Sequence, residues 1–392
     1  MPLRSDFLWG ASTSAHQVEG DNWTSDWWRL EHTPGVPLER SGDAVDHYHR
    51  YPEDMALLAG AGLNAYRFSL EWARIEPERG EFSRAQLAHY RRMIDTALTT
   101  GLTPVVTLHH FTHPAWFAAS GGWDAPDALD RFATYVERVT SILDGVEWVI
   151  TINEPNVLAM MLGMQARAAE RGSPDLHSAQ APLPDERIGT RLRGAHRRAV
   201  EVVRARTSAK VGWSVGQQAL TPTPGNEETF ARVSWLWEDM YLEASRGDDF
   251  LGTQSYTSQG VDANGVVPHP ESPENTLTGW AYRPDALGIA LRHAHEVTGG
   301  LPLLVTENGI ATTDDRRRVT YTREALRHLV AATDDGVDVR GYLHWSALDN
   351  YEWGHWAPTF GLIAVDRTTF ERRPKPSLSW LGSVAQSNAE GI

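Results

Sequence analysis

The sequence predicts an α/β protein that folds as a single (β/α)8 barrel, with one domain over residues 1–392. Eight strand-like runs alternate with segments of helical periodicity, and strict alternation of this kind indicates a parallel sheet with helical crossovers. The length of 392 residues also suits such a barrel. An open, doubly wound sheet is the alternative. It is disfavoured because no Gly-rich phosphate loop follows any of the runs.

The eight expected strands are short runs, each of which ends at a polar residue or a turn signal. The fourth and the seventh are the clearest, because apolar, β-branched runs at 147–152 and 301–305 lead directly into a glutamate motif. In chain order, the expected strands span residues 7–10, 65–69, 104–108, 148–152, 211–215, 250–254, 303–306 and 341–345.

Helical periodicity fills the sequence between these strands. The clearest helical segments span residues 53–61, 84–100, 127–143, 185–206 and 322–334. Two stretches, 166–184 and 261–278, are rich in Pro, Ser, Gly and acidic residues. Because they follow the fourth and the sixth strand, we expect them to form loops over the barrel mouth.

Composition excludes several classes of protein. With a net charge of −15, the chain lacks the excess of basic residues that is typical of proteins that bind nucleic acids. The absence of Cys excludes disulfides, thiolate metal sites and cysteine nucleophiles. No apolar stretch approaches the roughly 20 residues that span a bilayer. The N-terminus has no apolar signal core, so a soluble, cytoplasmic protein is expected.

Two glutamates stand at the ends of the clearest strands. Glu154 lies in Thr-Ile-Asn-Glu-Pro at 151–155, and Glu307 lies in Thr-Glu-Asn-Gly at 306–309. In one parallel barrel, both carboxyl groups would point into the same mouth. Paired carboxyl groups around a shared space are what the cleavage of a glycosidic bond requires. Because Pro155 follows, we expect Glu154 to be extended and the next helix to begin no earlier than this point.

Polar and aromatic residues follow nearly every expected strand, which suggests a ring of ligands around the mouth. The ring comprises Gln17, Arg67, His110, Asn153, Glu154, Gln254, Tyr256, Glu307 and Trp345. Several of the 16 Trp residues lie in Gly-, Asp- or His-rich surroundings rather than in apolar runs. Aromatic faces in a cleft suit the C–H face of a sugar, while carboxylates and amides bind its hydroxyls.

Two other chemistries are alternatives. His47 with His49, and the group of His109, His110 and His113, suggest a metal site, but no matched set of further ligands accompanies them. A Ser-His-Asp hydrolase would carry a Gly-x-Ser-x-Gly elbow, which the sequence lacks. We therefore expect no metal and no cofactor.

Together these motifs resemble glycoside hydrolase family 1, the β-glucosidase family. The resemblance runs through nearly the whole chain. The blocks that carry it lie at residues 7–20, 46–48, 66–69, 107–110, 121–123, 151–155, 306–309, 345–353 and 360–362.

The resemblance implies a (β/α)8 barrel that hydrolyses non-reducing terminal β-D-glycosides with retention, through a glycosyl-enzyme ester. It assigns the acid/base to Glu154 and the nucleophile to Glu307, which Arg67 and Tyr256 would keep ionised and oriented. Asn153 would bind the 2-hydroxyl of the sugar. The other implied sugar ligands are Gln17, His110, Glu352 and Trp353, with Trp345 as the stacking floor and Phe360 on the wall.

Departures from the family pattern concern the leaving-group side. Gln254-Ser255-Tyr256 stands where the family usually has Asn-Tyr-Tyr, and His109 to Thr112 replaces Tyr-His-Trp-Asp. The usual Gly- and Pro-containing loop after Glu154 is also missing. Glu352 argues against the 6-phospho-glycosidase branch, because its carboxylate would repel a phosphate.

A small β-glycoside is the expected partner, most simply a β-glucoside, with β-galactosidase and β-fucosidase activities left open. Transfer of the sugar to an alcohol by the same intermediate is one alternative function. A sugar-binding pseudoenzyme is the other, and the presence of both glutamates speaks against it. The sequence does not indicate an oligomeric state.

Overall fold

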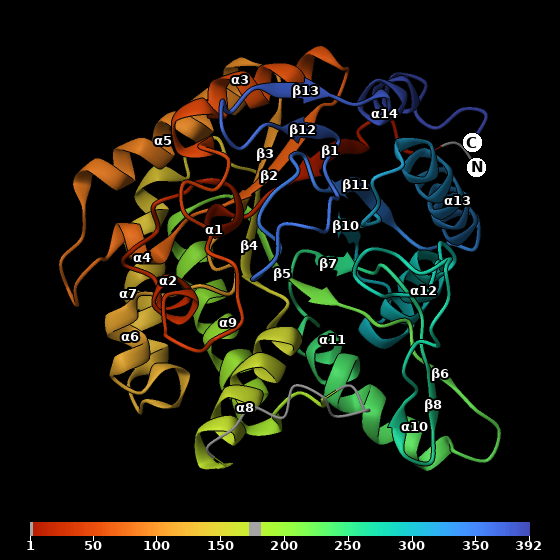
Figure 1. Cartoon of the computed structure of the whole chain (residues 1–392), viewed down its shortest axis with the longest axis horizontal. Coiled ribbons are helices and arrows are strands. Elements are labelled where there is room, and N and C mark those ends of the chain that lie inside the picture. The colour runs from red at the N-terminus through yellow and green to blue at the C-terminus, as the bar shows by residue number, and fades with distance from the viewer. Residues whose placement is uncertain (1–2, 172–181) are drawn as a thin grey trace.

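Eight parallel strands close into a barrel, as the sequence predicts (Figure 1). The structure is a computed structural model that describes residues 3–171 and 182–392. Around the barrel the strands follow the order β1-β11-β10-β7-β5-β4-β3-β2. Their bounds are β1 Leu8–Ser12, β2 Ala65–Ser69, β3 Thr103–Thr107, β4 Trp148–Asn153, β5 Lys210–Gly216, β7 Leu251–Gln254, β10 Leu303–Glu307 and β11 Val339–Trp345.

Helices surround the barrel and cover its outer face (Figure 1). They are α1 Ala15–Val18, α2 Asp26–Glu31, α3 His47–Gly60, α4 Trp72–Ile75, α5 Arg84–Thr99, α6 Ala115–Ala119, α7 Ala128–Val139, α8 Pro155–Arg171, α9 Glu186–Arg206, α10 Glu227–Ser234, α11 Met240–Ala244, α12 Ala286–Thr298, α13 Asp315–Asp334 and α14 Pro376–Gln386. Two 3-10 turns, η1 Gly122–Asp124 and η2 Thr140–Ile142, and a π-helical turn, η3 Trp235–Asp239, complete the helical elements of the described residues.

Several element boundaries differ from the prediction. Helix α3 begins at His47 rather than at 53 and carries Pro52 inside it. Helix α13 begins at Asp315 rather than at 322. Because α8 continues to Arg171, the predicted loop 166–184 is helical in its first part, and its residues 172–181 lie outside the described residues.

Small sheets lie outside the barrel. The predicted loop 261–278 contains most of a hairpin of β8 (Gly260–Asp262) and β9 (Gly265–Val266), which β6 (Thr221–Pro222) extends. A second hairpin, β12 (Ile363–Val365) with β13 (Arg372–Pro374), precedes the last helix.

The barrel interior changes from apolar to polar along the strands. An apolar cluster fills its amino-terminal end, formed by Leu8, Ala65, Val105, Trp148, Ile150, Phe250, Leu304 and Leu343. Residues two positions further along a strand face the same side. These include Arg67, Thr107 and Thr306, all of which are buried and polar. The carboxyl end of the barrel is therefore a polar chamber above an apolar floor.

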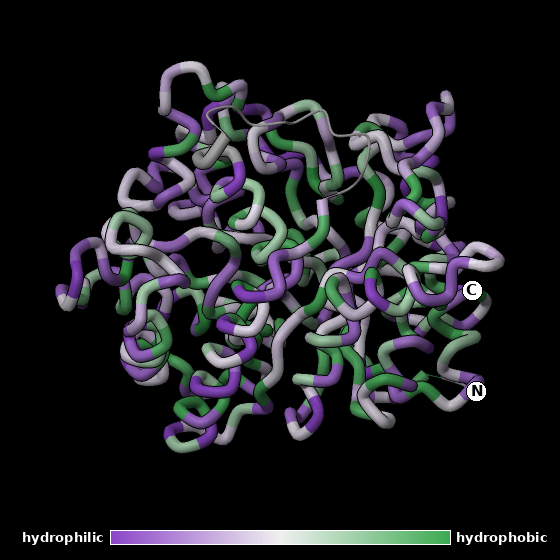
Figure 2. Tube along the Cα trace, turned by 90° about the horizontal axis from the view of Figure 1, so that it is seen from below, coloured by the Kyte–Doolittle hydropathy of each residue, from purple (hydrophilic) through white to green (hydrophobic). Residues whose placement is uncertain are grey.

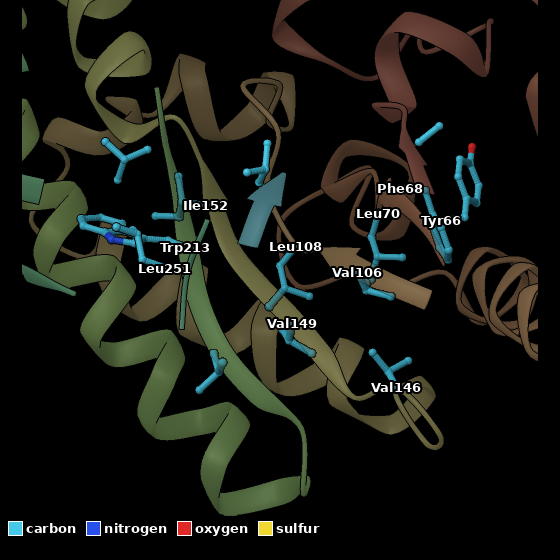
Figure 3. Close-up of a cluster of buried hydrophobic side chains, with 14 of the residues drawn as sticks. Tyr66, Phe68, Leu70, Val106, Leu108, Val146, Val149, Ile152, Trp213 and Leu251 are labelled. Carbon is cyan, nitrogen blue, oxygen red and sulfur yellow. The ribbon is translucent and has the colours of Figure 1, made fainter. Parts of the chain in front are cut away.

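The main core lies between the strands and the helices. Figure 3 shows part of it, with Phe68, Val106 and Val149 pointing outward from three neighbouring strands. In the view of Figure 2, hydrophilic segments lie along the outer loops. Among the described residues, none of the helices has the length and apolar character needed to cross a membrane.

The first described residues of the chain contact its C-terminal segment. Asn388 donates from Nδ2 to the carbonyl oxygens of Leu3 and Arg4, at 3.0 and 3.1 Å. Its Oδ1 accepts from the indole of Trp9 at 3.1 Å. The first barrel strand is thereby fixed to the end of the chain. That residues 1–392 form one domain stays a prediction.

Candidate active site

Glu307 is the last residue of β10 and is buried in the polar chamber. Its Oε1 accepts from Nη1 of Arg67 at 2.5 Å, and its Oε2 accepts from the hydroxyl of Tyr256 at 2.5 Å. Burial raises the pKa of Glu307 above its ordinary value, although the charge of Arg67 and the hydrogen bonds from Tyr256, Arg67 and Gln254 oppose the shift. Both carboxylate oxygens are thus held by donors that favour the anion.

Arg67 organises the chamber, because each nitrogen of its guanidinium has a partner. Besides Glu307, it binds Oγ1 of Thr107 through Nε at 3.0 Å and Oδ1 of Asn153 through Nη2 at 2.5 Å. Nη1 also donates to the carbonyl oxygen of Thr306 at 3.3 Å. The planar fork of an arginine fixes all of these groups in one geometry.

Glu154 lies where strand β4 turns into helix α8. Its N–H donates to the carbonyl oxygen of Ser214 at 2.7 Å, and its own carbonyl accepts from Leu158 of α8 at 2.9 Å. The predicted start of the helix at Pro155 is therefore confirmed. The predicted extended backbone is wrong, because Glu154 has φ 41°. A single residue makes the change from strand to helix, and this requires a left-handed backbone.

The carboxyl group of Glu154 has a different environment from that of Glu307. Burial raises its pKa well above the ordinary value, the negative charge of Glu307 raises it further, and Arg67 opposes both. Among the described residues, no side chain donates a hydrogen bond to it. Of the two causes that raise this pKa, burial is the larger.

Gln17, Trp345 and Glu352 come together from distant parts of the chain. Nε2 of Gln17 donates to Oε2 of Glu352 at 3.1 Å, and Nε1 of Trp345 donates to Oε1 at 3.1 Å. Burial raises the pKa of Glu352 to about 8, and the hydrogen bond from Trp345 opposes the shift. This carboxyl group therefore takes up a proton more readily than a free glutamate does.

Stacked rings form one wall of the site. The ring of His110 stacks on Trp345, with centroids 5.9 Å apart, and on Trp353, with centroids 6.0 Å apart. Its Nε2 also lies 3.2 Å from Nδ2 of Asn153. Phe360 packs near Tyr256, with centroids 5.9 Å apart. These contacts join the predicted sugar ligands to Arg67 and Glu307.

All eleven predicted site residues lie in this one region. Gln17, Arg67, His110, Asn153, Tyr256, Glu307, Trp345, Glu352, Trp353 and Phe360 are linked by the contacts described above. Glu154 lies close enough to Glu307 for the charge of Glu307 to raise its pKa. The structure therefore brings together what the sequence places along more than three hundred positions.

Asn156 and Gly216 support Glu154, and sequence reasoning did not identify either. Nδ2 of Asn156 donates to the carbonyl oxygens of Gly216 and of Trp237, at 2.5 and 2.7 Å. Gly216 has no side chain where the carboxyl of Glu154 lies against it. The only sign in the sequence is the glycine near the end of a strand. Asn156 gives no such sign, because both of its partners are backbone atoms of distant segments.

Both the sequence and the fold are similar to those of known proteins. A family model described as glycosyl hydrolase family 1 matches residues 1–243 and 240–390. The thermostable beta-glucosidase B of Thermobispora bispora is 34% identical over 428 aligned positions, covering 97% of this chain and 90% of that protein. A bifunctional beta-D-glucosidase/beta-D-fucosidase of Bifidobacterium breve is 30% identical, covering 95% of this chain and 96% of that protein. The crystal structure of beta-glycosidase BGL167 superimposes with a TM-score of 0.90 at 43% identity, covering 100% and 99% of the two chains.

Proposed function

The chain belongs to glycosyl hydrolase family 1 and is a glycoside hydrolase, and from this premise we infer that it cleaves terminal β-D-glucosides with retention. One observation carries the mechanism. The charge of Glu307 raises the pKa of Glu154, and of these two carboxyl groups only that of Glu307 has hydrogen-bond donors among the described residues. Environments that push two carboxyl pKa values apart are the mark of an acid paired with a nucleophile.

In the first step, Glu307 attacks the anomeric carbon and forms the glycosyl ester. Arg67 and Tyr256 donate to its two oxygens, which favours the anion and aims it before the substrate binds. Glu154, whose pKa is raised well above its ordinary value, holds its proton to a higher pH than a free glutamate does and gives it to the leaving oxygen. We expect their carboxyl groups to lie about 5–5.5 Å apart, as a retaining mechanism requires.

In the second step, water releases the sugar from Glu307. Once Glu307 is an ester it carries no charge, so it no longer raises the pKa of Glu154. Glu154 is then a stronger acid than in the free enzyme, although burial still raises its pKa. Having given up its proton in the first step, it removes a proton from the attacking water. The same side chain thus acts as acid and base because its neighbour changes charge between the steps.

The remaining predicted residues would bind the sugar. Asn153 would donate to the 2-hydroxyl, where contacts strengthen in the transition state. Gln17, His110, Glu352 and Trp353 would bind the other hydroxyls, with Trp345 beneath the ring and Phe360 beside it. A protonated Glu352 can donate as well as accept, which suits a group that must bind hydroxyls of more than one orientation.

β-Glucosides are the proposed main substrates, with β-fucosides as further ones, in line with the names of the relatives. Those names also favour hydrolysis over glycosyl transfer as the main reaction. β-Galactosides remain to be tested beside them. A cytoplasmic location remains part of the proposal, and cell fractionation with an antibody against the chain would check it.

The decisive experiment is intact mass after incubation with 2-deoxy-2-fluoro-β-glucosyl fluoride, followed by peptide mapping. The fluorine slows both steps, and the reactive fluoride lets the first step proceed, so a retaining enzyme accumulates its glycosyl ester. We expect a stable adduct on Glu307. An adduct on another residue would refute the assigned roles. No adduct with the gluco, galacto and manno reagents would refute the retaining mechanism.

A further inference from the structure

Gln254, the last residue of β7, reaches across the chamber to Asn153. Its Nε2 donates to Oδ1 of Asn153 at 2.8 Å and to Oγ1 of Thr306 at 3.2 Å. The side chain is fully buried, and its Oε1 has no hydrogen-bond donor among the described residues. Only the N–H side of this amide is therefore in use, although leaving a buried acceptor unpaired is costly.

The two donors on Asn153 determine which way its amide faces. Oδ1 accepts from Arg67 and from Gln254, so the opposite orientation would place the Asn153 amide nitrogen against two donors. In the observed orientation, Nδ2 contacts Nε2 of His110 at 3.2 Å. One N–H of that nitrogen binds His110, and the other stays available for a ligand.

Side-chain length explains why a glutamine can make this contact. Strand β5 lies between β7 and β4 in the barrel, so Gln254 and Asn153 stand on strands that are not neighbours. Adjacent strands lie about 4.8 Å apart, and a side chain that crosses one of them must be long. An asparagine at position 254 would be shorter by one methylene group, about 1.5 Å.

We propose that Gln254 is a positioning residue that fixes the Asn153 amide in the orientation that binds the 2-hydroxyl of the sugar. This inference rests on the proposed function, in which Asn153 is the ligand of that hydroxyl. Gln254 acts through Asn153 and does not itself touch the sugar. Its effect should therefore depend on whether the substrate has a 2-hydroxyl.

The test compares kcat/KM for 4-nitrophenyl β-D-glucoside with kcat/KM for its 2-deoxy analogue. A loss of kcat/KM that is common to both substrates cancels in the ratio of the two values, because both substrates need the same acid and nucleophile. We expect Gln254→Met to lower this ratio about tenfold, the worth of one hydrogen bond. Gln254→Asn keeps the amide but shortens its reach, so it should lower the ratio as well, even if the methionine variant folds poorly.

Two further variants make the result decisive. Gln217→Met makes the same substitution at the end of the neighbouring strand, where the amide donates to the carbonyl oxygen of Ala290 at 3.1 Å. It should leave the ratio unchanged. Asn153→Ala should lower the ratio, and if it does not, the proposed role of Asn153 itself is wrong. If Asn153→Ala lowers the ratio while both Gln254 variants keep the wild-type value, the positioning role of Gln254 is overturned.

Discussion

Gly216 lies against the carboxyl group of Glu154 so closely that a Cβ atom at this glycine would be 2.3 Å from Oε1. Position 216 is the last residue of β5, and its backbone is also bound by Asn156. The carboxyl group of Glu154, the proposed acid, therefore fits in its place only because Gly216 on the neighbouring strand has no side chain.

Gly216→Ala should displace Glu154 without unfolding the protein, because the atoms in conflict are at the end of a flexible side chain. A shift of about 1 Å in a catalytic group can cost about 100-fold in rate. We expect a loss of this size in kcat/KM for phenyl β-glucoside and a much smaller loss for the 2,4-dinitrophenyl glucoside, whose leaving group needs no proton. Gly260→Ala, with only ordinary contacts near its Cβ, is the control. Equal losses on both substrates would contradict this account.

Glu154→Gln should remove the acid/base while leaving the nucleophile in place. General acid catalysis contributes about 10²–10⁴-fold, so kcat/KM for phenyl β-glucoside should fall by that amount. With the dinitrophenyl glucoside, the first step should stay fast and the ester should accumulate, and added azide should restore turnover as the β-glucosyl azide. Formation of the α-azide would show that the enzyme inverts. Glu147→Gln, at an exposed ion pair with Lys210, should behave as wild type.

Tyr256→Phe should shift the acidic limb of the pH profile. The hydroxyl of Tyr256 lowers the pKa of Glu307, so its removal raises that pKa, and the carboxylate is protonated over a wider acidic range. The acidic limb of kcat/KM should move to higher pH, while the basic limb, which reports Glu154, should move less. Tyr282→Phe removes a hydroxyl that donates to Glu324 and should shift neither limb. A fall in rate with an unmoved acidic limb would count against the role given to Tyr256.

Asp54→Asn should destabilise the fold rather than the site. Asp54 accepts both Nε and Nη2 of Arg372, at 2.7 and 2.9 Å, and lies 2.7 Å from Nδ1 of His47. Removing one partner of a buried pair costs about 3–5 kcal/mol in the free energy of unfolding. Urea unfolding of wild type and variant at pH 7 measures the difference.

The same substitution has a defined pH dependence. Although burial opposes it, hydrogen bonds from Arg372 and His47 hold the pKa of Asp54 below its ordinary value of 3.8. The stability that this carboxylate contributes is present above the unfolded pKa and is lost as the pH falls through the folded one. The difference in the free energy of unfolding between wild type and variant should therefore become smaller below about pH 4. Arg373→Gln, whose partner Glu371 is exposed, is the control.

The sequence could predict the barrel because each strand is a local pattern, and all eight were placed within a few residues. It could also predict the positions of Glu154 and Glu307, because both close apolar runs. It could not predict that α3 passes through Pro52. A proline inside a helix costs a hydrogen bond, but here His47 is held by Asp54 and Tyr66. That compensation comes from tertiary contacts and leaves no local signal.

The contacts that support the site could not be predicted from the sequence either. Asn156 binds two backbone carbonyls, one of them in the π-helical turn η3, and no sequence pattern predicts such a contact. The left-handed backbone of Glu154 contradicted the local rule for a residue before proline. In both cases a distant segment determined the conformation.

The barrel closes only when its last strand is present, so the site is complete only late in the synthesis of the chain. β1 pairs with β11, the last barrel strand, and Gln17 meets Glu352 across 335 positions of the chain. A nascent chain that has reached residue 310 already carries both glutamates but lacks the strand that completes the barrel and the aromatic floor of the sugar site. A chain truncated after residue 310 should thus have no hydrolytic activity, although it contains both Glu154 and Glu307.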